Sequence, residues 1–239
     1  MSAIAAAATQ AATGQPPEMH APDGFLSVPV AAVMWLVTIV VLAIAIRRVD
    51  RTLDPRAVPM MGVAGAFIFA AQMFNFQVAG GTSGHLLGGV LAAILLGPWA
   101  GTLVMACVIA VQALIFQDGG LVAMGANIFN MGIVGTLGGF YLYRVLTRVL
   151  GGEERARMPA AAIAAWASVV AGAVCMAVEL AVSGTTPLQL ALPAMVGVHV
   201  VIGVGEALIT VAALSFIAAT RSDLLRLRDA RVNRAIPTT

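Results

Sequence analysis

Residues 28–51 read VPVAAVMWLVTIVVLAIAIRRVDR, and this stretch decides the fold class of the chain. Its apolar part contains no charged residue over about the length that crosses a bilayer as an α-helix. Three arginines, Arg47, Arg48 and Arg51, follow it directly. Because the cytoplasmic ends of membrane spans carry an excess of arginine and lysine, we predict that this end is cytoplasmic and that the N-terminus lies outside.

The composition of the whole chain is typical of a membrane protein. Hydrophobic residues make up 60% of it and charged residues 10%, and the mean hydropathy is +0.97. Soluble domains carry about 25% charged residues, so a water-soluble core would not absorb this apolar excess. We therefore predict an all-α integral membrane protein in a lipid bilayer. The chain has no lysine, so it lacks the usual phosphate-loop lysine, and we expect neither ATP hydrolysis nor nucleic-acid binding.

The positions of the basic residues predict the topology. All 13 are arginines, and they fall within residues 47–56, 144–157 and 221–234. About seven transmembrane helices, with the N-terminus outside and the C-terminus cytoplasmic, place all three clusters on the cytoplasmic side. The predicted spans cover residues 28–46, 58–78, 86–96, 99–116, 121–143, 159–182 and 193–219.

The third predicted span, residues 86–96, is short. As a helix it would extend about 16 Å, which is half of a hydrocarbon core. We count it as a span because the later arginine clusters would otherwise change sides of the membrane.

The chain divides into three parts. Residues 1–18 are rich in Ala, Thr, Gln and Pro and contain no basic residue, so they lack the positively charged start of a secretory signal. We interpret them as a disordered extension or as the product of a misassigned start codon. Residues 19–220 are predicted to form a single transmembrane domain, and residues 221–239 a basic cytoplasmic tail.

Two of the three histidines, His20 and His85, are predicted on the outer membrane face. His85 ends a glycine-rich loop that we expect to be flexible. Imidazole is the commonest side-chain ligand of transition metals, so the pair indicates either a metal site or two unrelated loop histidines. In a chain that began at Met19, the amine, the His20 amide and the His20 ring would form two fused chelate rings. With His85 as fourth ligand, such a planar nitrogen set suits Ni(II) or Cu(II) and can hold Co(II).

Polar side chains inside the predicted spans form a second group. Glu179 and Glu206 are each either functional groups or hydrogen-bonded residues that fix helix packing. His199 precedes Glu206 by about 10 Å along the helix, which is too far for a shared ligand site. Five amide side chains in the outer half are candidates to hydrogen-bond a ligand histidine: Asn75, Gln77, Gln112, Asn127 and Asn130.

Several motifs together resemble the CbiM/NikM family. They are MHAPDGFL at 19–26, FNFQ at 74–77 with GGTSGHLLG at 80–88, QALIFQDGG at 112–120, NIFNMG at 127–132, and the segment from His199 to Glu206. Members of this family are the cobalt/nickel substrate-binding (S) components of energy-coupling factor (ECF) transporters. The resemblance covers essentially residues 19–220.

The resemblance implies a function and a ligand set. The function is capture of Co(II) or Ni(II) as transported substrate at the extracytoplasmic face, with no enzymatic activity of the chain itself. The metal would be held by the amine of Met19, the amide nitrogen and ring of His20, and the ring of His85. Residues 1–18 depart from the family pattern, because a preceding residue converts the Met19 amine into an amide.

The resemblance also implies partners in separate chains and a location. The partners are a membrane coupling (T) component like CbiQ or NikQ, an ATPase (A) component like CbiO or NikO, and a small accessory membrane subunit like CbiN or NikN. The location is the inner (cytoplasmic) membrane of a bacterial cell, with multiple passes.

Two other classes of function use the same residues. A membrane-embedded metalloenzyme would use His20, His85 and a glutamate, although the sequence contains no HExxH motif. A stand-alone channel or carrier would have Glu206 and His199 on its pathway. Co-purification of an ATPase favours the ECF component, substrate turnover by the isolated chain favours the enzyme, and ion flux without ATP favours the channel or carrier.

Overall fold

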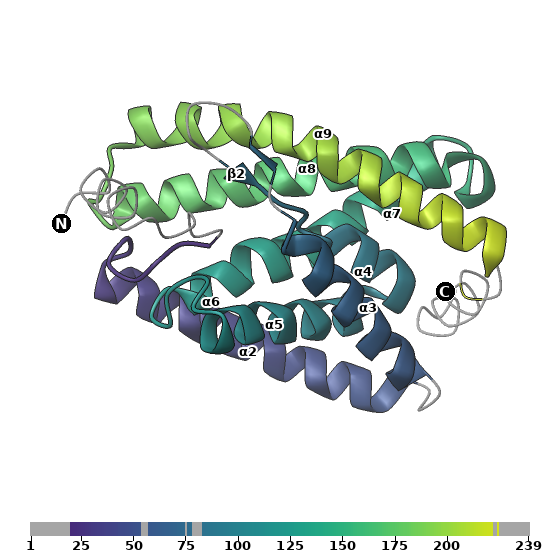
Figure 1. The fold of residues 1–239 in the computed structure, drawn as a ribbon, viewed down its shortest axis with the longest axis horizontal. Coiled ribbons are helices and arrows are strands. Elements are labelled where there is room, and N and C mark those ends of the chain that lie inside the picture. The colour runs from purple at the N-terminus through teal and green to yellow at the C-terminus, as the bar shows by residue number, and fades with distance from the viewer. Residues whose placement is uncertain (1–19, 54–56, 75, 78–82, 222–223, 225–239) are drawn as a thin grey trace.

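The computed structural model describes residues 20–53, 57–74, 76–77, 83–221 and 224. Nearly all of the regular structure in this part of the chain is helical (Figure 1). The helices are α2 (Val28–Thr52), α3 (Val58–Gln72), α4 (Gly89–Leu96), α5 (Pro98–Ile115), α6 (Met124–Asn127), the π-helix η2 (Ile128–Gly138), α7 (Gly139–Val149), α8 (Glu153–Val182) and α9 (Leu188–Thr220). Strand β1 (Phe76–Gln77) pairs with the antiparallel strand β2 (Ser83–Gly84) just before His85. The predicted extension 1–18 lies outside the described residues, and of the tail only residues 221 and 224 are described.

Four helices, α2, α5, α8 and α9, are long and apolar enough to cross a membrane. Helix α3 is a shorter apolar helix, and α6, η2 and α7 follow one another without a break from Met124 to Val149. These helices confirm the helical membrane-protein prediction, while the count of seven spans stays a prediction.

Prolines mark several helix beginnings. Helices α2, α3 and α5 each have a proline in the first turn, where the missing N–H would make no intrahelical bond. Helix α2 therefore begins at Val28, as predicted. Helix α3 ends at Gln72, earlier than the predicted residue 78, because the chain turns there toward the β1–β2 ribbon.

The helices form two groups with a shared middle layer. Figure 1 shows α8 and α9 as a long hairpin along one side and α2, α3 and α5 on the other, with α4 and α7 between them. Helix α4 is buried from Gly89 to Ile94. A Cβ atom added to Gly89 would lie 2.9 Å from the carbonyl carbon of Gly135, so the backbones of α4 and η2 are in contact. Small residues permit this close packing, which drives helix association in lipid.

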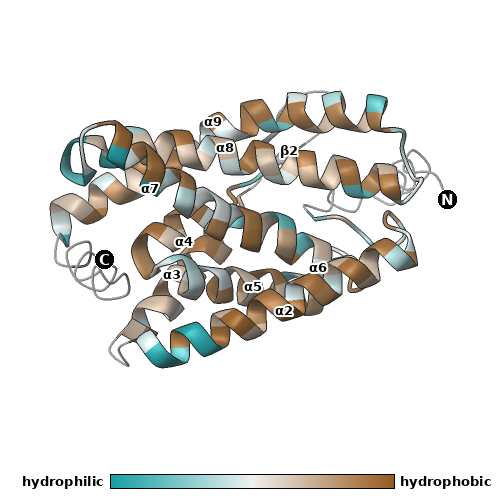
Figure 2. Cartoon of the chain, turned by 180° about the vertical axis from the view of Figure 1, so that it is seen from behind, coloured by the Kyte–Doolittle hydropathy of each residue, from teal (hydrophilic) through white to brown (hydrophobic). Residues whose placement is uncertain are grey.

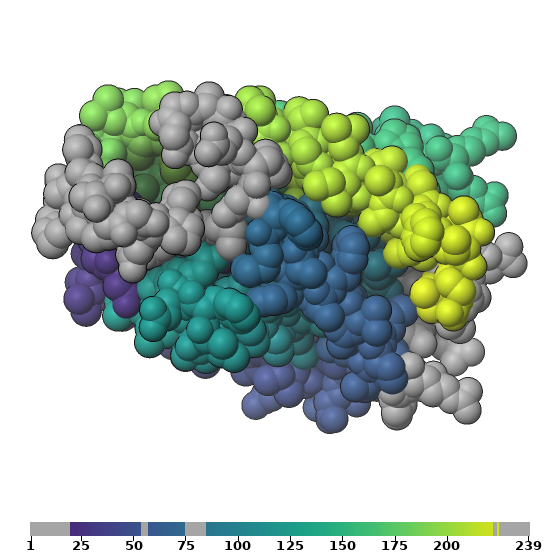
Figure 3. Space-filling view, viewed as in Figure 1, coloured from purple at the N-terminus to yellow at the C-terminus, as the bar shows by residue number. Residues whose placement is uncertain are grey.

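The outer surface is apolar along its length. Figure 2 shows hydrophobic residues along the outward side of α2, where Leu36 and Ile39 are more than half exposed. Helix α9 forms much of the face seen in Figure 3, and its Leu208 and Phe216 are exposed as well. This surface fits contact with lipid tails rather than water.

The loops sort to the two ends of the bundle. The segment after the N-terminus and the α8–α9 turn meet at one end, where the Thr185 hydroxyl donates to the carbonyl of Phe25 at 2.6 Å. The ends of α2, α7 and α9 lie at the opposite end (Figure 1). There Arg144 forms an ion pair with Glu153 at 3.7 Å. The arginine-bearing ends of α2, α7 and α9 therefore lie opposite the end with the α8–α9 turn.

Candidate metal centre

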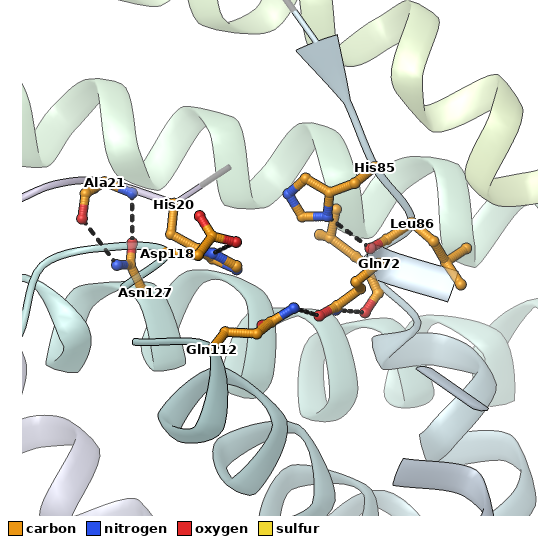
Figure 4. A network of polar contacts seen from close by, with 9 residues as sticks. His20, Ala21, Gln72, His85, Leu86, Gln112, Asp118 and Asn127 are labelled. Carbon is orange, nitrogen blue, oxygen red and sulfur yellow. Dashed lines mark hydrogen bonds and ion pairs between the residues drawn. The ribbon is translucent and has the colours of Figure 1, made fainter. Parts of the chain in front are cut away.

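The rings of His20 and His85 lie next to each other (Figure 4), and the residues just after His85 contact Glu206 in the middle part of α9. Their centroids are 5.4 Å apart and their planes are inclined at 49°. Two imidazoles that bind one ion at nitrogen–metal distances of about 2 Å place their ring centres roughly 4.5–6.5 Å apart. The pair is therefore spaced as two ligands of one ion would be.

Both histidines are buried, with 4% of His20 and 8% of His85 exposed. The expectation of a flexible outer loop implied an exposed His85 ring, and this part of the expectation is wrong. Its ring is covered because the segment that follows it leads directly into the buried helix α4. The ring is held as well, since Nδ1 of His85 lies 2.8 Å from the carbonyl oxygen of Leu86. A carbonyl only accepts, so Nδ1 is the donor in this contact, and in the neutral ring Nε2 would carry the lone pair that a metal needs.

The segment after His85 is fastened from two sides. The Glu206 carboxylate on α9 accepts from the N–H groups of Leu87 at 2.6 Å and Gly88 at 2.9 Å. From α3, the Gln72 amide donates to the carbonyl of Leu87 at 2.7 Å, and Gln112 on α5 donates in turn to Gln72 at 2.8 Å. Glu206 was expected to be either a functional group or a hydrogen-bonded residue that fixes packing. These contacts favour the second interpretation, and the segment that Glu206 holds directly follows His85.

The arm that carries His20 is fastened by different elements. Asn127 of α6 pairs with both the N–H and the carbonyl of Ala21, each at 3.1 Å. The N–H of Gly120 donates to the same carbonyl at 3.0 Å. The Asp23 carboxylate accepts from the N–H groups of residues 121–123 at 2.8–3.2 Å, as a cap before a helix does.

Asp118 is the residue that sequence reasoning missed. Its Oδ2 lies 3.2 Å from Nδ1 of His20, and both side chains are largely buried. The adjacent Gly119 has a φ of +95°, and a Cβ atom there would lie 2.6 Å from the Cβ of His20. The only signal in the sequence was an acidic residue beside two glycines at the predicted outer face, which does not show what it contacts.

The other predicted site residues lie elsewhere or outside the described part of the chain. Met19 and Asn75 are outside it, as is the side chain of Gln77. Asn130 donates to Glu179 at 3.0 Å, and Nδ1 of His199 donates to the carbonyl of Met195 within α9 at 2.6 Å.

The described residues contain no group of three or more His, Cys, Asp or Glu side chains that could hold a metal ion. The two histidines therefore need further donors, such as backbone nitrogen, to complete a coordination shell.

Comparison with known proteins agrees with this site. The family model for CbiM, described as the cobalt uptake substrate-specific transmembrane region, matches residues 20–224. The chain is 34% identical to the fused nickel transport protein NikMN of Rhodobacter capsulatus, over 89% of this chain and 65% of that protein. It is 30% identical to the cobalt transport protein CbiM of Sorangium cellulosum, over 90% of this chain and 98% of that one.

A solved structure is also similar. The crystal structure of a truncated transition metal transporter superposes with a TM-score of 0.76 at 34% identity, covering 84% of this chain and 99% of that chain. The chain therefore belongs to the CbiM family of cobalt-uptake membrane proteins, the CbiM/NikM family that its motifs resemble.

Proposed function

We propose that this protein is the substrate-capture (S) subunit of an ECF-type importer for Co(II) or Ni(II). The observation that carries the proposal is the buried pair of rings, His20 and His85, whose centroids are 5.4 Å apart. Each ring is held by a separate segment of the chain inside an apolar helical bundle. Family membership supports a cobalt or nickel ion as the transported substrate.

The proposed ligands are four nitrogens. They are the amine of Met19, the amide nitrogen and ring of His20, and the ring of His85. The two neighbouring imidazoles would fill two positions on the metal, and the amine of Met19 and the amide nitrogen of His20 would fill the other two. Binding through an amide nitrogen releases a proton, so the affinity of this set rises with pH.

The proposed orientation puts the end with the α8–α9 turn outside the cell. Among the described residues, the arginine-bearing ends of α2, α7 and α9 lie at the opposite end, and arginine-rich ends face the cytoplasm. Seven spans with the N-terminus outside and the C-terminus inside satisfy every cluster. In this arrangement, residues 19–220 are one transmembrane domain of the bacterial inner membrane. The metal is captured from the extracytoplasmic side.

The proposed partners supply the energy. The chain has no phosphate-loop lysine, so ATP hydrolysis would take place in a separate ATPase (A) component, joined through a membrane coupling (T) component and a small accessory subunit. Reorientation of this subunit against its partners would release the metal inward.

The proposal is tested by co-expressing the chain with the T, A and accessory components of a CbiM-family transporter, purifying it, and measuring Ni(II) and Co(II) uptake into liposomes. We expect an ATPase to co-purify and uptake to require ATP. Uptake by the isolated chain without ATP would instead identify a carrier, and turnover of an organic substrate would identify an enzyme.

A further inference from the structure

One peptide group connects Glu206 to the ring of His85. The peptide between Leu86 and Leu87 is bound at both ends: its carbonyl accepts from Nδ1 of His85 at 2.8 Å, and its N–H donates to Oε2 of Glu206 at 2.6 Å. Because a peptide group is planar and rigid, an anchor at its N–H also fixes the direction of its carbonyl. The carboxylate therefore acts on the histidine through one peptide plane.

The next peptide group is held in the same way. The carbonyl of Leu87 accepts from Gln72 at 2.7 Å, and the N–H of Gly88 donates to Oε1 of Glu206 at 2.9 Å. Gly88 has a φ of +79°, a left-handed conformation that other residues rarely adopt. Both oxygens of Glu206 thus accept backbone N–H groups, and only 2% of the residue is exposed.

The two histidines are anchored to different parts of the bundle. The His20 arm is bound to Asn127 of α6 and, through Asp23, to the residues just before α6. The His85 segment is bound to α9 through Glu206 and to α3 through Gln72. Helix α9 packs chiefly on α8, so the placement of His85 depends on the α8–α9 hairpin through Glu206, whereas the ring-bearing end of the His20 arm is held by Asn127 and Gly120.

We infer that Glu206 is a positioning residue for the metal site, which sets the ring orientation and the metal-facing nitrogen of His85 through the Leu86–Leu87 peptide and makes both depend on α9. The inference deepens the proposed function and rests on it for the role of the ring. Partner groups that orient a metal-binding histidine commonly bond its second nitrogen directly. Here the partner is the carbonyl of Leu86, and the carboxylate holds that carbonyl in place.

The chemistry of the side chain at 206 gives a sharp test. Glu206→Gln keeps the shape but replaces one acceptor oxygen with an NH₂ group, which would face a backbone N–H. Glu206→Asp keeps the charge but is too short to reach both N–H groups. Glu179→Gln is the matched control, because Glu179 is also a buried carboxylate on a long helix but accepts from Asn130.

The experiment measures the metal-free reactivity of each histidine in the full chain, purified in detergent, with diethyl pyrocarbonate and mass spectrometry. We expect Glu206→Gln to speed modification of His85 by about tenfold or more, since a lost bond to a charged group costs that factor. Glu206→Asp should have a smaller effect, and His20 should react as in the wild type. The Glu179→Gln variant should leave both histidines unchanged.

A second measurement records the ligand-field absorption of bound Ni(II). In the Glu206→Gln protein the band should shift and the affinity for Ni(II) should fall, because His85 is misplaced. If His85 in both Glu206 variants reacts as slowly as in Glu179→Gln, the inference is wrong. The reactivity assay contains no metal, so its result bears on the role of Glu206 alone. The proposed function is tested separately, because unchanged Ni(II) affinity in His85→Ala would overturn it. Should Glu206→Gln fail to fold, Glu206→Asp gives the same comparison.

Discussion

Nδ1 of His20 lies 3.2 Å from Oδ2 of Asp118, so a carboxylate borders the ring nitrogen that the proposed chelate would use. A divalent ion bound by His20 would therefore have negative charge within a few ångströms. Metal binding through Nδ1 would replace this contact, and the carboxylate would remain beside the new cation. We therefore expect Asp118 to raise the affinity of this site for a divalent ion.

Replacement of Asp118 tests this charge. We expect Asp118→Asn to weaken Ni(II) and Co(II) binding by about 10–100-fold, the usual effect of losing a group that supports a metal ligand. The control is Asp50→Asn, an exposed carboxylate near the far end of α2, which changes net charge equally. Isothermal titration calorimetry measures both, and an equal loss in the two variants would contradict the local role.

His85→Ala should abolish tight metal binding and leave the fold intact. The substitution removes one of two buried imidazoles, and two rings are the only histidine ligands of the proposed site. His199→Ala is the control, because the ring of His199 bonds within its own helix. Equilibrium dialysis with Ni(II) and a thermal unfolding curve give the two readouts. Wild-type affinity in His85→Ala would place the site elsewhere.

Gly119→Ala should disturb the placement of His20. The new Cβ would lie 2.6 Å from the Cβ of His20, whereas a Cβ at Gly184 would have no atom within 4 Å. Both glycines have positive φ, so each substitution costs roughly 1–2 kcal/mol in backbone strain. We expect a larger drop in melting temperature in Gly119→Ala than in Gly184→Ala, because only the first adds a steric clash, and a loss of Ni(II) affinity in Gly119→Ala alone. Equal affinities would show that His20 tolerates the shift.

The start of the chain is the fourth prediction. The proposed chelate needs an uncapped amine at Met19, and a residue in front of it converts that amine to an amide, which binds only after losing a proton. Protein that begins at Met19 should therefore bind metal far more tightly than the 239-residue chain. A side-by-side titration compares them, and N-terminal sequencing of native protein identifies the natural start. Equal affinities would leave His20 and His85 as the ligands.

The features that sequence could predict are those set by local pattern. The apolar run after Ser27, with Pro29 in its first turn, defines where α2 begins. The arginine clusters and the number of apolar runs between them predicted that His20 and His85 lie on the same side of the membrane, and the structure brings their rings together.

The features that sequence could not predict depend on packing between distant segments. Glu206 reaches the N–H groups of Leu87 and Gly88 across the bundle, and nothing in the pattern around position 206 specifies that contact. The same holds for Asp118 beside His20. Hydrogen bonds to backbone groups leave no complementary side chain in the sequence, so only the folded chain shows them.

The shortness of α4 bears on how the protein is made. Helix α4 has 8 residues and extends about 12 Å, less than half of a hydrocarbon core. Its ends would leave backbone groups bare in lipid, so the helix is stable at membrane depth only inside protein. We therefore expect α4 to take its place only after α5 and η2 have formed its walls, which would make assembly of the His85 segment a late step of maturation.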